Sequence, residues 1–451
     1  MARQFAGSSA LAEGQLGLAL APALTPTGPL AEPSFFHGFA THPQVLARGL
    51  VTLADVTATR YFQFTPSALR DPVLTGHGDR LRAECFSACN GVYARLDLLH
   101  TGFDGGDIGF GTTNVDIGSE MRALLSAVAP NELLHLDVGL EGLAAATVER
   151  SARQRPVQMP DRWVRSLGNA AELHHGVTEA FRLTTDQARS FIAALPQATG
   201  KAQAGWLTAA PGGARLVARR TGGAVRIVGL HRLSALKRML THVTGLTVYG
   251  PSDGQPGPVV VTAELPGARM TLGLTEVAWR GHSGEGALLA SLVEPVVAED
   301  ADLVLMMLSF EAVIDTEALA RSTGLEPARV RGALALLAAY GRVGWDTHEQ
   351  AWFHRELPAD PDRVEKDNPR LVGARTLVAA GAVAVEAGSS TRWVVRSAGI
   401  EYAVRLAPAS LAAGTPTAEA ACTCRWYLTH PKGRGACKHV LAVEIFLQGR
   451  R

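Results

Sequence analysis

The stretch CTCRWYLTHPKGRGACKH, residues 422–439, decides how the last part of this 451-residue chain folds. Its three cysteines and its last histidine come as two pairs, each with one residue between the members. Side chains of an extended segment alternate between faces, so Cys422 and Cys424 project the same way. In a helix the same spacing puts side chains on opposite sides, so we expect Cys437 in the turn before a helix that begins near Lys438.

Three thiolates and one neutral imidazole satisfy the tetrahedral preference of Zn²⁺. Four protein ligands leave no open position for water or substrate, so we expect one structural zinc and no catalytic metal. The expected ligands are Cys422, Cys424, Cys437 and His439. The alternative is a set of inert buried cysteines beside a surface histidine. His430, which stands in a loop with proline and glycine, is interpreted as solvent-facing and not as a ligand.

The two pairs, with twelve residues between them, resemble the CxC…CxH pattern of the SWIM zinc finger. The similarity covers about residues 395–448 and includes aromatic residues after the first pair and an apolar helix after the second. It implies a ββα-type unit that binds one zinc and contacts DNA or protein. Some bacterial SWIM proteins resemble this layout and are associated with MoxR-type AAA ATPases and von Willebrand A domain proteins. The resemblance therefore implies a protein partner of that kind as one option.

Residues 299–357 have the order helix, helix, turn, helix and hairpin, which is typical of a winged helix-turn-helix. Asp315 is placed to cap one helix, Gly324 to make the turn, and Pro327 to begin the next helix. We expect helices over residues 303–312, 316–322 and 327–340, and a hairpin from strands 343–345 and 351–354.

Charge distinguishes these two C-terminal modules. Residues 299–357 carry ten acidic and five basic side chains, a net charge of −5, which disfavours contact with phosphates. We therefore expect protein contact or a scaffold role there instead of base reading. From Cys422 onward six basic residues stand against one acid, so the finger is the better candidate for binding nucleic acid. Its expected contacts are Arg425, Lys432, Arg434 and Lys438, and the alternative is a solvated basic face.

Composition indicates a folded α+β multidomain protein, with 47% hydrophobic residues, 19% charged residues and a net charge of +1. No apolar run reaches the roughly 18 residues of a membrane span, and no signal-peptide pattern is present. We therefore expect no membrane partner and a cytoplasmic location. Five cysteines are too few for a disulfide scaffold, and Cys85 and Cys89 are interpreted as small buried residues beside a hairpin that turns at Asn90-Gly91.

Six segments are expected along the chain. They are a loosely ordered lead-in (1–33), an N-terminal α+β domain (34–200), a second α+β domain (201–298), a winged-helix-like module (299–357), a linker (358–370) and a SWIM zinc-finger domain (371–451). The histidines at positions 174, 175 and 231 are interpreted as surface or helix-end residues, and the basic residues of an expected helix over 230–240 as a solvated face.

The glycine- and aspartate-rich stretch DGGDIGFGTTNVD, residues 104–116, is interpreted as a turn-rich structural loop before a helix that begins near Ser119. It lacks the lysine of a phosphate-binding P-loop. The main hypothesis is therefore a non-enzymatic interaction protein. The alternative is an enzyme or ligand-binding protein whose site gathers Asp104, Asp107, Asn114 and Asp116 in a pocket.

Overall fold

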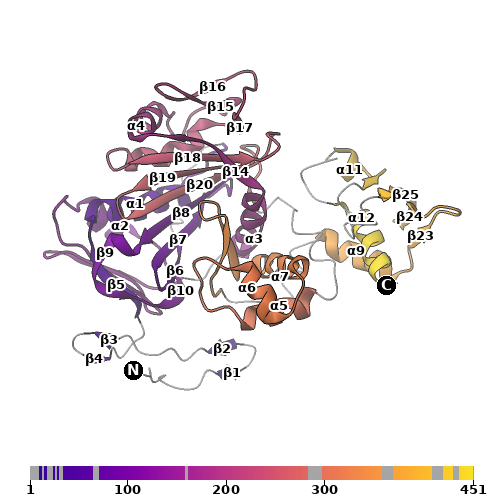
Figure 1. Ribbon diagram of the computed structural model, residues 1–451, viewed down its shortest axis with the longest axis horizontal. Helices are drawn as coiled ribbons and strands as arrows, with labels where there is room; N and C mark the ends of the chain where they lie inside the picture. The colour runs from indigo at the N-terminus through magenta and orange to yellow at the C-terminus, as the bar shows by residue number, and fades with distance from the viewer. Residues whose placement is uncertain are drawn as a thin grey trace.

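The computed structural model describes residues 34–63, 71–157, 161–282, 297–357, 369–408, 420–429 and 436–449. Four short strands before them are described as backbone only, namely β1 (Ala10–Ala12), β2 (Gln15–Gly17), β3 (Leu24–Thr25) and β4 (Gly28–Pro29). Most of the expected lead-in (1–33) and linker (358–370) lies outside the described residues. The described chain is a mixture of helices and antiparallel sheets (Figure 1).

The largest sheet has eight antiparallel strands in the order β10-β6-β7-β8-β20-β19-β18-β14. Its strands are β6 (Val73–His77), β7 (Arg80–Phe86), β8 (Val92–Leu99), β10 (Phe110–Asn114), β14 (Val177–Leu183), β18 (Gly245–Pro251), β19 (Val259–Leu265) and β20 (Ala268–Leu274). The predicted hairpin is confirmed as β7–β8, and Asn90 in its turn has a left-handed φ of 60°. Since β20 pairs with β8, this sheet contains strands from both sides of the expected boundary between residues 200 and 201. The division of the chain into two domains there stays a prediction.

The two faces of this sheet differ in chemistry, because side chains along each strand alternate between them. On one face apolar residues pack under helix α1 (Pro43–Thr57): Gly49 of α1 lies against Leu96, and Cys85 donates to the Leu53 carbonyl. The other face carries buried charged residues of β7 and β8. It is covered by helix α3 (Asp161–His175) and by a hairpin described below.

A second sheet of five strands has the order β13-β12-β11-β5-β9. Its strands are β5 (Ser34–Ala40), β9 (Phe103–Ile108), β11 (His135–Gly139), β12 (Gly142–Ala146) and β13 (Ser151–Gln154). The 3₁₀ turn η1 (His100–Gly102) leads into β9, and α2 (Ser119–Ser126) follows β10.

The stretch 104–116 is therefore not the loop that the sequence suggested. It forms most of β9 and all of β10, which pair with β5 and β6 in two different sheets. Its glycines serve close packing: a Cβ at Gly106 would overlap the His37 carbonyl oxygen, and one at Gly111 would overlap the Phe35 ring. Glycine at these positions lets neighbouring strands and rings approach closely. The amino-acid composition of the stretch does not distinguish this role of glycine from turn formation.

A small sheet of three strands, β15 (Ala204–Ala210), β16 (Gly213–Val217) and β17 (Val225–Val228), lies at the top of Figure 1. It packs on helix α4 (Thr185–Ala194), which begins at a capping box formed by Thr184 and Gln187. The expected helix over 230–240 is present as the 3₁₀ helix η2 (Leu230–Met239).

The segment from residue 297 to 357 forms α5 (Val297–Met306), α6 (Thr316–Thr323), α7 (Pro327–Ala339) and a hairpin of β21 (Val343–Asp346) and β22 (Ala351–His354). Asp315 caps α6 by accepting from two main-chain N–H groups, as expected. The expected helix over 303–312 is displaced by six residues at both ends, because α5 begins at Val297 and ends at Met306. Phe310 has a φ of 61°, and the Ile314 N–H donates to the Trp352 carbonyl, so pairing with the hairpin replaces the helix there.

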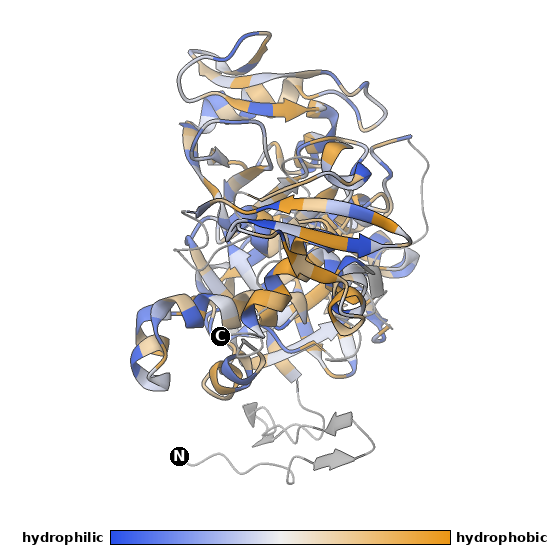
Figure 2. Cartoon of the chain, turned by 90° about the vertical axis from the view of Figure 1, so that its right-hand side faces the viewer, coloured by the Kyte–Doolittle hydropathy of each residue, from blue (hydrophilic) through white to orange (hydrophobic). Residues whose placement is uncertain are grey.

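The last described part contains α9 (Pro369–Ala379), α11 (Arg425–Thr429), α12 (Lys438–Gln448) and a sheet in the order β23-β24-β25-β26. The strands are β23 (Val383–Val385), β24 (Arg392–Ser397), β25 (Ile400–Arg405) and β26 (Ala421–Cys422). Strands that face the viewer in Figure 2 carry both hydrophobic and hydrophilic residues. Along β24 buried residues alternate with more exposed ones, as expected where one face of a sheet is buried. Within the described residues, no helix is both long enough and apolar enough to cross a membrane.

Candidate metal centre and other candidate sites

Four residues of the last sheet and helix converge on one point. Cys422 ends strand β26, Cys424 stands just before α11, Cys437 is the N-cap of α12, and His439 lies in the first turn of that helix. All four side chains are buried, and their ligand atoms lie within 4.8 Å of one another. In the part of the chain that the structure describes, this is the one group of three or more such residues that can hold a metal ion.

The main chain around the cysteines is arranged to stabilise sulfur. The Cys424 N–H points at the Cys422 Sγ at 3.4 Å, and the Tyr427 N–H points at the Cys424 Sγ at 3.4 Å. Cys437 stands at the positive end of α12, which favours a thiolate there. Cys422 stands at the end of a strand and Cys424 just before a helix, where main-chain N–H groups lack partners within those elements. These N–H groups therefore point at sulfur.

His439 presents its Nδ1 atom to the thiols, at 3.8 Å from the Cys422 Sγ. Its ring stacks on Tyr402 of β25, with ring centroids 4.1 Å apart and an interplanar angle of 20°. The Nε2 atom is buried and has no hydrogen-bond partner among the described residues. The stacking fixes the orientation of the ring and leaves Nδ1 as the nitrogen that can bind an ion.

The three thiols alter one another's acidity through hydrogen bonds and charge. A hydrogen bond from the Cys422 thiol lowers the pKa of Cys437 to about 4, and the same bond raises the pKa of Cys422 well above its usual value. Burial raises the pKa of Cys424. One thiolate is thus favoured while its neighbours stay protonated, since three adjacent negative charges repel one another. A divalent cation at the centre supplies the charge that would ionise all three.

The residues expected to touch nucleic acid are only partly described. Arg425 is exposed at the start of α11, and the Lys438 Nζ donates to the Ser397 hydroxyl of β24 at 2.9 Å. Lys432 and Arg434 lie outside the described residues, as does His430.

A buried cluster of charges joins the large sheet to the hairpin β21–β22. Arg82 and Arg95 each contact Asp97 on the sheet and Asp346 on the hairpin, at distances of 2.6 to 2.8 Å, and all four side chains are at most 1% exposed. No sequence motif predicted this cluster. Its signal was the presence of charged residues within two strands whose alternate residues are apolar.

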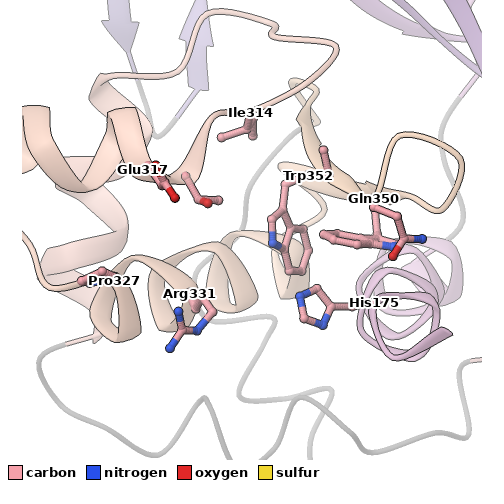
Figure 3. Close-up of a pocket in the computed structure, with 10 residues that line it drawn as sticks. His175, Ile314, Glu317, Pro327, Arg331, Gln350 and Trp352 are labelled. Atoms are coloured by element: carbon pink, nitrogen blue, oxygen red, sulfur yellow. The ribbon is translucent and has the colours of Figure 1, made fainter. Parts of the chain in front are cut away.

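A cavity of about 310 Å³ lies between α3, α6, α7 and the hairpin (Figure 3). Trp345, Trp352 and His175 line it as an aromatic group, with the two tryptophan ring centroids 5.3 Å apart. Glu317 and Arg331, on α6 and α7, bring opposite charges to the same cavity. Ligand sites in proteins are typically apolar hollows of roughly 300–1,000 Å³ with a few polar groups, so this cavity has the size of the smallest of them. Sequence analysis did not identify it.

The alternative site at residues 104–116 has a different geometry from the one expected. Asp104 is exposed on β9, whereas Asn114 is buried at the end of β10 and donates to the Val157 carbonyl. The side chain of Asp107 lies outside the described part. Asp104 and Asn114 thus stand on strands of two different sheets.

The three histidines assigned to the surface or to helix ends do lie at helix ends, in the last turn of α3 and the first turn of η2, but two of them are buried. His174 is 2% exposed and His231 is 1% exposed, and only His175 of the three keeps substantial exposure. Arg232, assigned to a solvated basic face, is 1% exposed and donates to main-chain carbonyls. The periodic spacing of apolar residues predicted the helices α3 and η2. It did not show that other segments cover the sides of these helices that carry His174, His231 and Arg232.

The sequence matches no family model and no curated protein. Among solved structures, the chain is similar to proliferating cellular nuclear antigen from Entamoeba histolytica, with 10% identity and a TM-score of 0.37 over 54% of this chain and 98% of that one. It is also similar to the PCNA2-PCNA3 complex from Sulfolobus tokodaii, with 12% identity and a TM-score of 0.38 over 53% of this chain and 98% of that one. Similarities this weak assign neither a fold family nor a function.

Proposed function

We propose that Cys422, Cys424, Cys437 and His439 bind one structural Zn²⁺, and that the ion stabilises a SWIM-type module whose role is contact with another macromolecule. The observation that carries the proposal is the convergence of the four buried ligand atoms within 4.8 Å. Three sulfurs and one nitrogen in a closed set are the ligands that structural zinc sites use. The zinc would leave no open position for water, so the proposed role is interaction and not catalysis.

The residues around the ligands have separate tasks in this proposal. The N–H groups of Cys424 and Tyr427 stabilise charge on sulfur, and Tyr402 holds the imidazole in place. Binding would release protons from the thiols, so affinity is expected to fall at low pH. When bound, the zinc contributes folding free energy to the four-stranded sheet and to α12, because it joins β26 to that helix.

Either a protein or nucleic acid fits as the partner of this module. The basic residues in and around residues 422–439 support nucleic acid, and the resemblance to SWIM proteins supports a protein such as an AAA ATPase or a von Willebrand A domain protein. For the helix-turn-helix segment we propose a winged-helix scaffold or protein contact. Asp346 and Glu349 of its hairpin pair with arginines of the large sheet, so these side chains are used in packing within the fold, which supports a scaffold role.

The zinc proposal is tested by comparing metal content in the full-length protein, Cys437→Ser and Cys89→Ser. Cys89 lies outside the metal group and serves as the matched control. We expect one equivalent of zinc in the wild type and in Cys89→Ser, and loss of zinc and a lower melting temperature in Cys437→Ser. A Cys437→Ser variant that keeps a full equivalent of zinc and an unchanged melting curve contradicts the assignment.

The partner is tested by measuring binding of the zinc-loaded protein to DNA at low and high salt, with Arg434→Glu and Lys438→Glu as variants. Binding that weakens with salt and is lost in the variants supports nucleic acid contact through the finger. Absence of any effect of these variants directs the search to protein partners.

A further inference from the structure

The segment between Asp186 and Asp253 contains no acidic residue at all. It carries nine lysines and arginines, in a chain whose net charge is only +1. Such an imbalance within one segment is unusual for a surface that only keeps a protein soluble, where both signs are normally interspersed.

Part of this positive charge is used within the fold. Arg189 donates to the carbonyls of Val243 and Thr241, and Arg238 pairs with Asp55 of α1. Arg232 is buried and donates to carbonyl oxygens. Of the six that remain, four lie on β16, on β17 and on the connection between them, namely Arg215, Arg219, Arg220 and Arg226.

This sheet buries one face and leaves the other open. Leu207 of β15 is paired across the strands with Leu216 and Val225, and this side packs into the main core. Side chains alternate along a strand, so Trp206 projects to the opposite side. On β17 the cross-strand partner of Trp206 is Arg226. Thr208 follows Trp206 by two residues on the same side of β15, and its cross-strand partner on β16 is Arg215.

The open side carries arginines beside one aromatic ring. We define the arginine face as Trp206, Arg215 and Arg226 on the strands, together with the exposed Arg219 and Arg220 on the connection between β16 and β17. The guanidinium carbons of Arg220 and Arg226 lie 5.7 and 5.9 Å from the centroid of the Trp206 ring. Among the described residues, none of the four arginines pairs with a carboxylate: Arg220 donates instead to the main-chain oxygen of Asp253.

We propose that the arginine face binds single-stranded DNA, with its phosphates on the arginines and one base on the Trp206 ring. Charge complementarity supports the polyanion, because unpaired arginines release counterions from a phosphate backbone when they bind it. The aromatic ring supports a single strand, since an unstacked base offers a free π-face and a paired base does not. The arginine face presents guanidinium groups for phosphates and an aromatic ring for a base in one place.

DNA is favoured over RNA because proteins distinguish the two by contacts to the 2′-hydroxyl, and apart from the arginines this face offers few polar groups for such contacts. Between the arginines the strands present small or apolar side chains, and Thr208 supplies the one hydroxyl on that side of β15. The surface is distinct from the zinc module in sequence, so the inference stands independently of the proposed finger function.

The experiment measures binding of the full-length, zinc-loaded protein to fluorescent oligo(dT), oligo(U) and a duplex of equal length, by anisotropy at several salt concentrations. The variants are Trp206→Ala, Trp206→Phe and the pair Arg220→Glu with Arg226→Glu. The matched control is Arg321→Glu, which reverses an exposed charge on α6 far from this sheet in sequence. Melting curves verify that each variant is folded.

We expect tightest binding to oligo(dT), weakened at least about fivefold by Trp206→Ala and largely restored by Trp206→Phe, because stacking requires only an aromatic ring. The double arginine variant should weaken binding further and lower the slope of log affinity against log salt by about 1.4, since each lost phosphate contact accounts for about 0.7. Arg321→Glu should leave binding unchanged.

Several outcomes overturn the proposal. They are equal or tighter binding to duplex or to oligo(U), an unchanged affinity in Trp206→Ala, an equal loss in Arg321→Glu, and no binding to any oligonucleotide at low salt. Single-strand binding that disappears in Cys437→Ser but persists in the sheet variants would place the contact in the finger. Persistence of binding in Cys437→Ser, with loss in the sheet variants, separates this inference from the fate of the zinc proposal.

Discussion

Arg95 of β8 and Asp346 of β21 stand 251 residues apart in the sequence and form an ion pair of 2.7 Å, with side chains that are 1% and 0% exposed. Arg82 and Asp97 complete the group. Removing charges from water is costly, so such a group persists only when each charge is paired and hydrogen-bonded. The hairpin is therefore held to the sheet in one register, and loss of one partner leaves another charge buried alone.

Asp346→Asn should lower the free energy of unfolding by about 3–5 kcal/mol, because the arginines lose a charged acceptor and face an amide N–H. The matched control is Asp79→Asn: Asp79 pairs with Arg80 but is half exposed, and its loss should cost less than about 1 kcal/mol. Urea unfolding measures both. A cost for Asp346→Asn no larger than that of Asp79→Asn contradicts this account.

The effect of Asp346→Asn should itself depend on pH. Burial opposes ionisation, but the neighbouring arginines hold the pKa of Asp346 well below its usual value. A carboxylate with a lowered folded pKa stabilises the native state above its unfolded pKa of about 3.9 and loses that contribution as the pH falls. The difference in stability between wild type and variant should therefore be constant from pH 7 to about pH 5 and shrink in stronger acid.

His282 should make the protein sensitive to mild acid. It is fully buried beside His174, and burial lowers its pKa to about 4. A histidine with a lowered folded pKa costs stability as the pH falls from its unfolded value of about 6.5 toward the folded one, by up to about 3 kcal/mol at pH 4. His282→Gln should flatten the dependence of stability on pH in this range. A variant with an unchanged pH profile contradicts the prediction.

Removal of metal should act locally. A chelator is expected to reduce the hydrogen-exchange protection of β24, β25 and α12, because the proposed ion joins β26 to that helix. Amides of β7 and β8 should keep their protection, since their core is formed by α1 and the neighbouring strands. Uniform loss of protection across both regions, or no change in α12, would count against a structural zinc in this module.

Gly106→Ala should destabilise the five-stranded sheet by about 1–3 kcal/mol, because its Cβ would meet the His37 carbonyl oxygen. Gly212→Ala is the matched control: it lies in the turn between β15 and β16 and would meet nothing within 4 Å. Thermal unfolding of both variants tests this. Equal stabilities would show that β9 can move away from β5 without cost.

Sequence alone predicted the features that depend on neighbours in the chain. The hairpin at Asn90-Gly91, the cap at Asp315 and the place of Cys437 before α12 follow from local backbone preferences and were found as expected. The ligand pairs of the metal group were likewise predicted, because one residue between ligands in a strand or at a helix start already limits where the side chains point.

Tertiary structure decided the features that depend on distant partners. The strands of residues 104–116 pair with β5 and β6, and their glycines allow a close approach to β5. The burial of Arg95 depends on an aspartate 251 residues away. The arginine face exists because one side of β15 is covered by the core while the other stays open. Local sequence sets backbone conformation and charge, but only packing between distant segments decides which charges are buried and which remain on the surface.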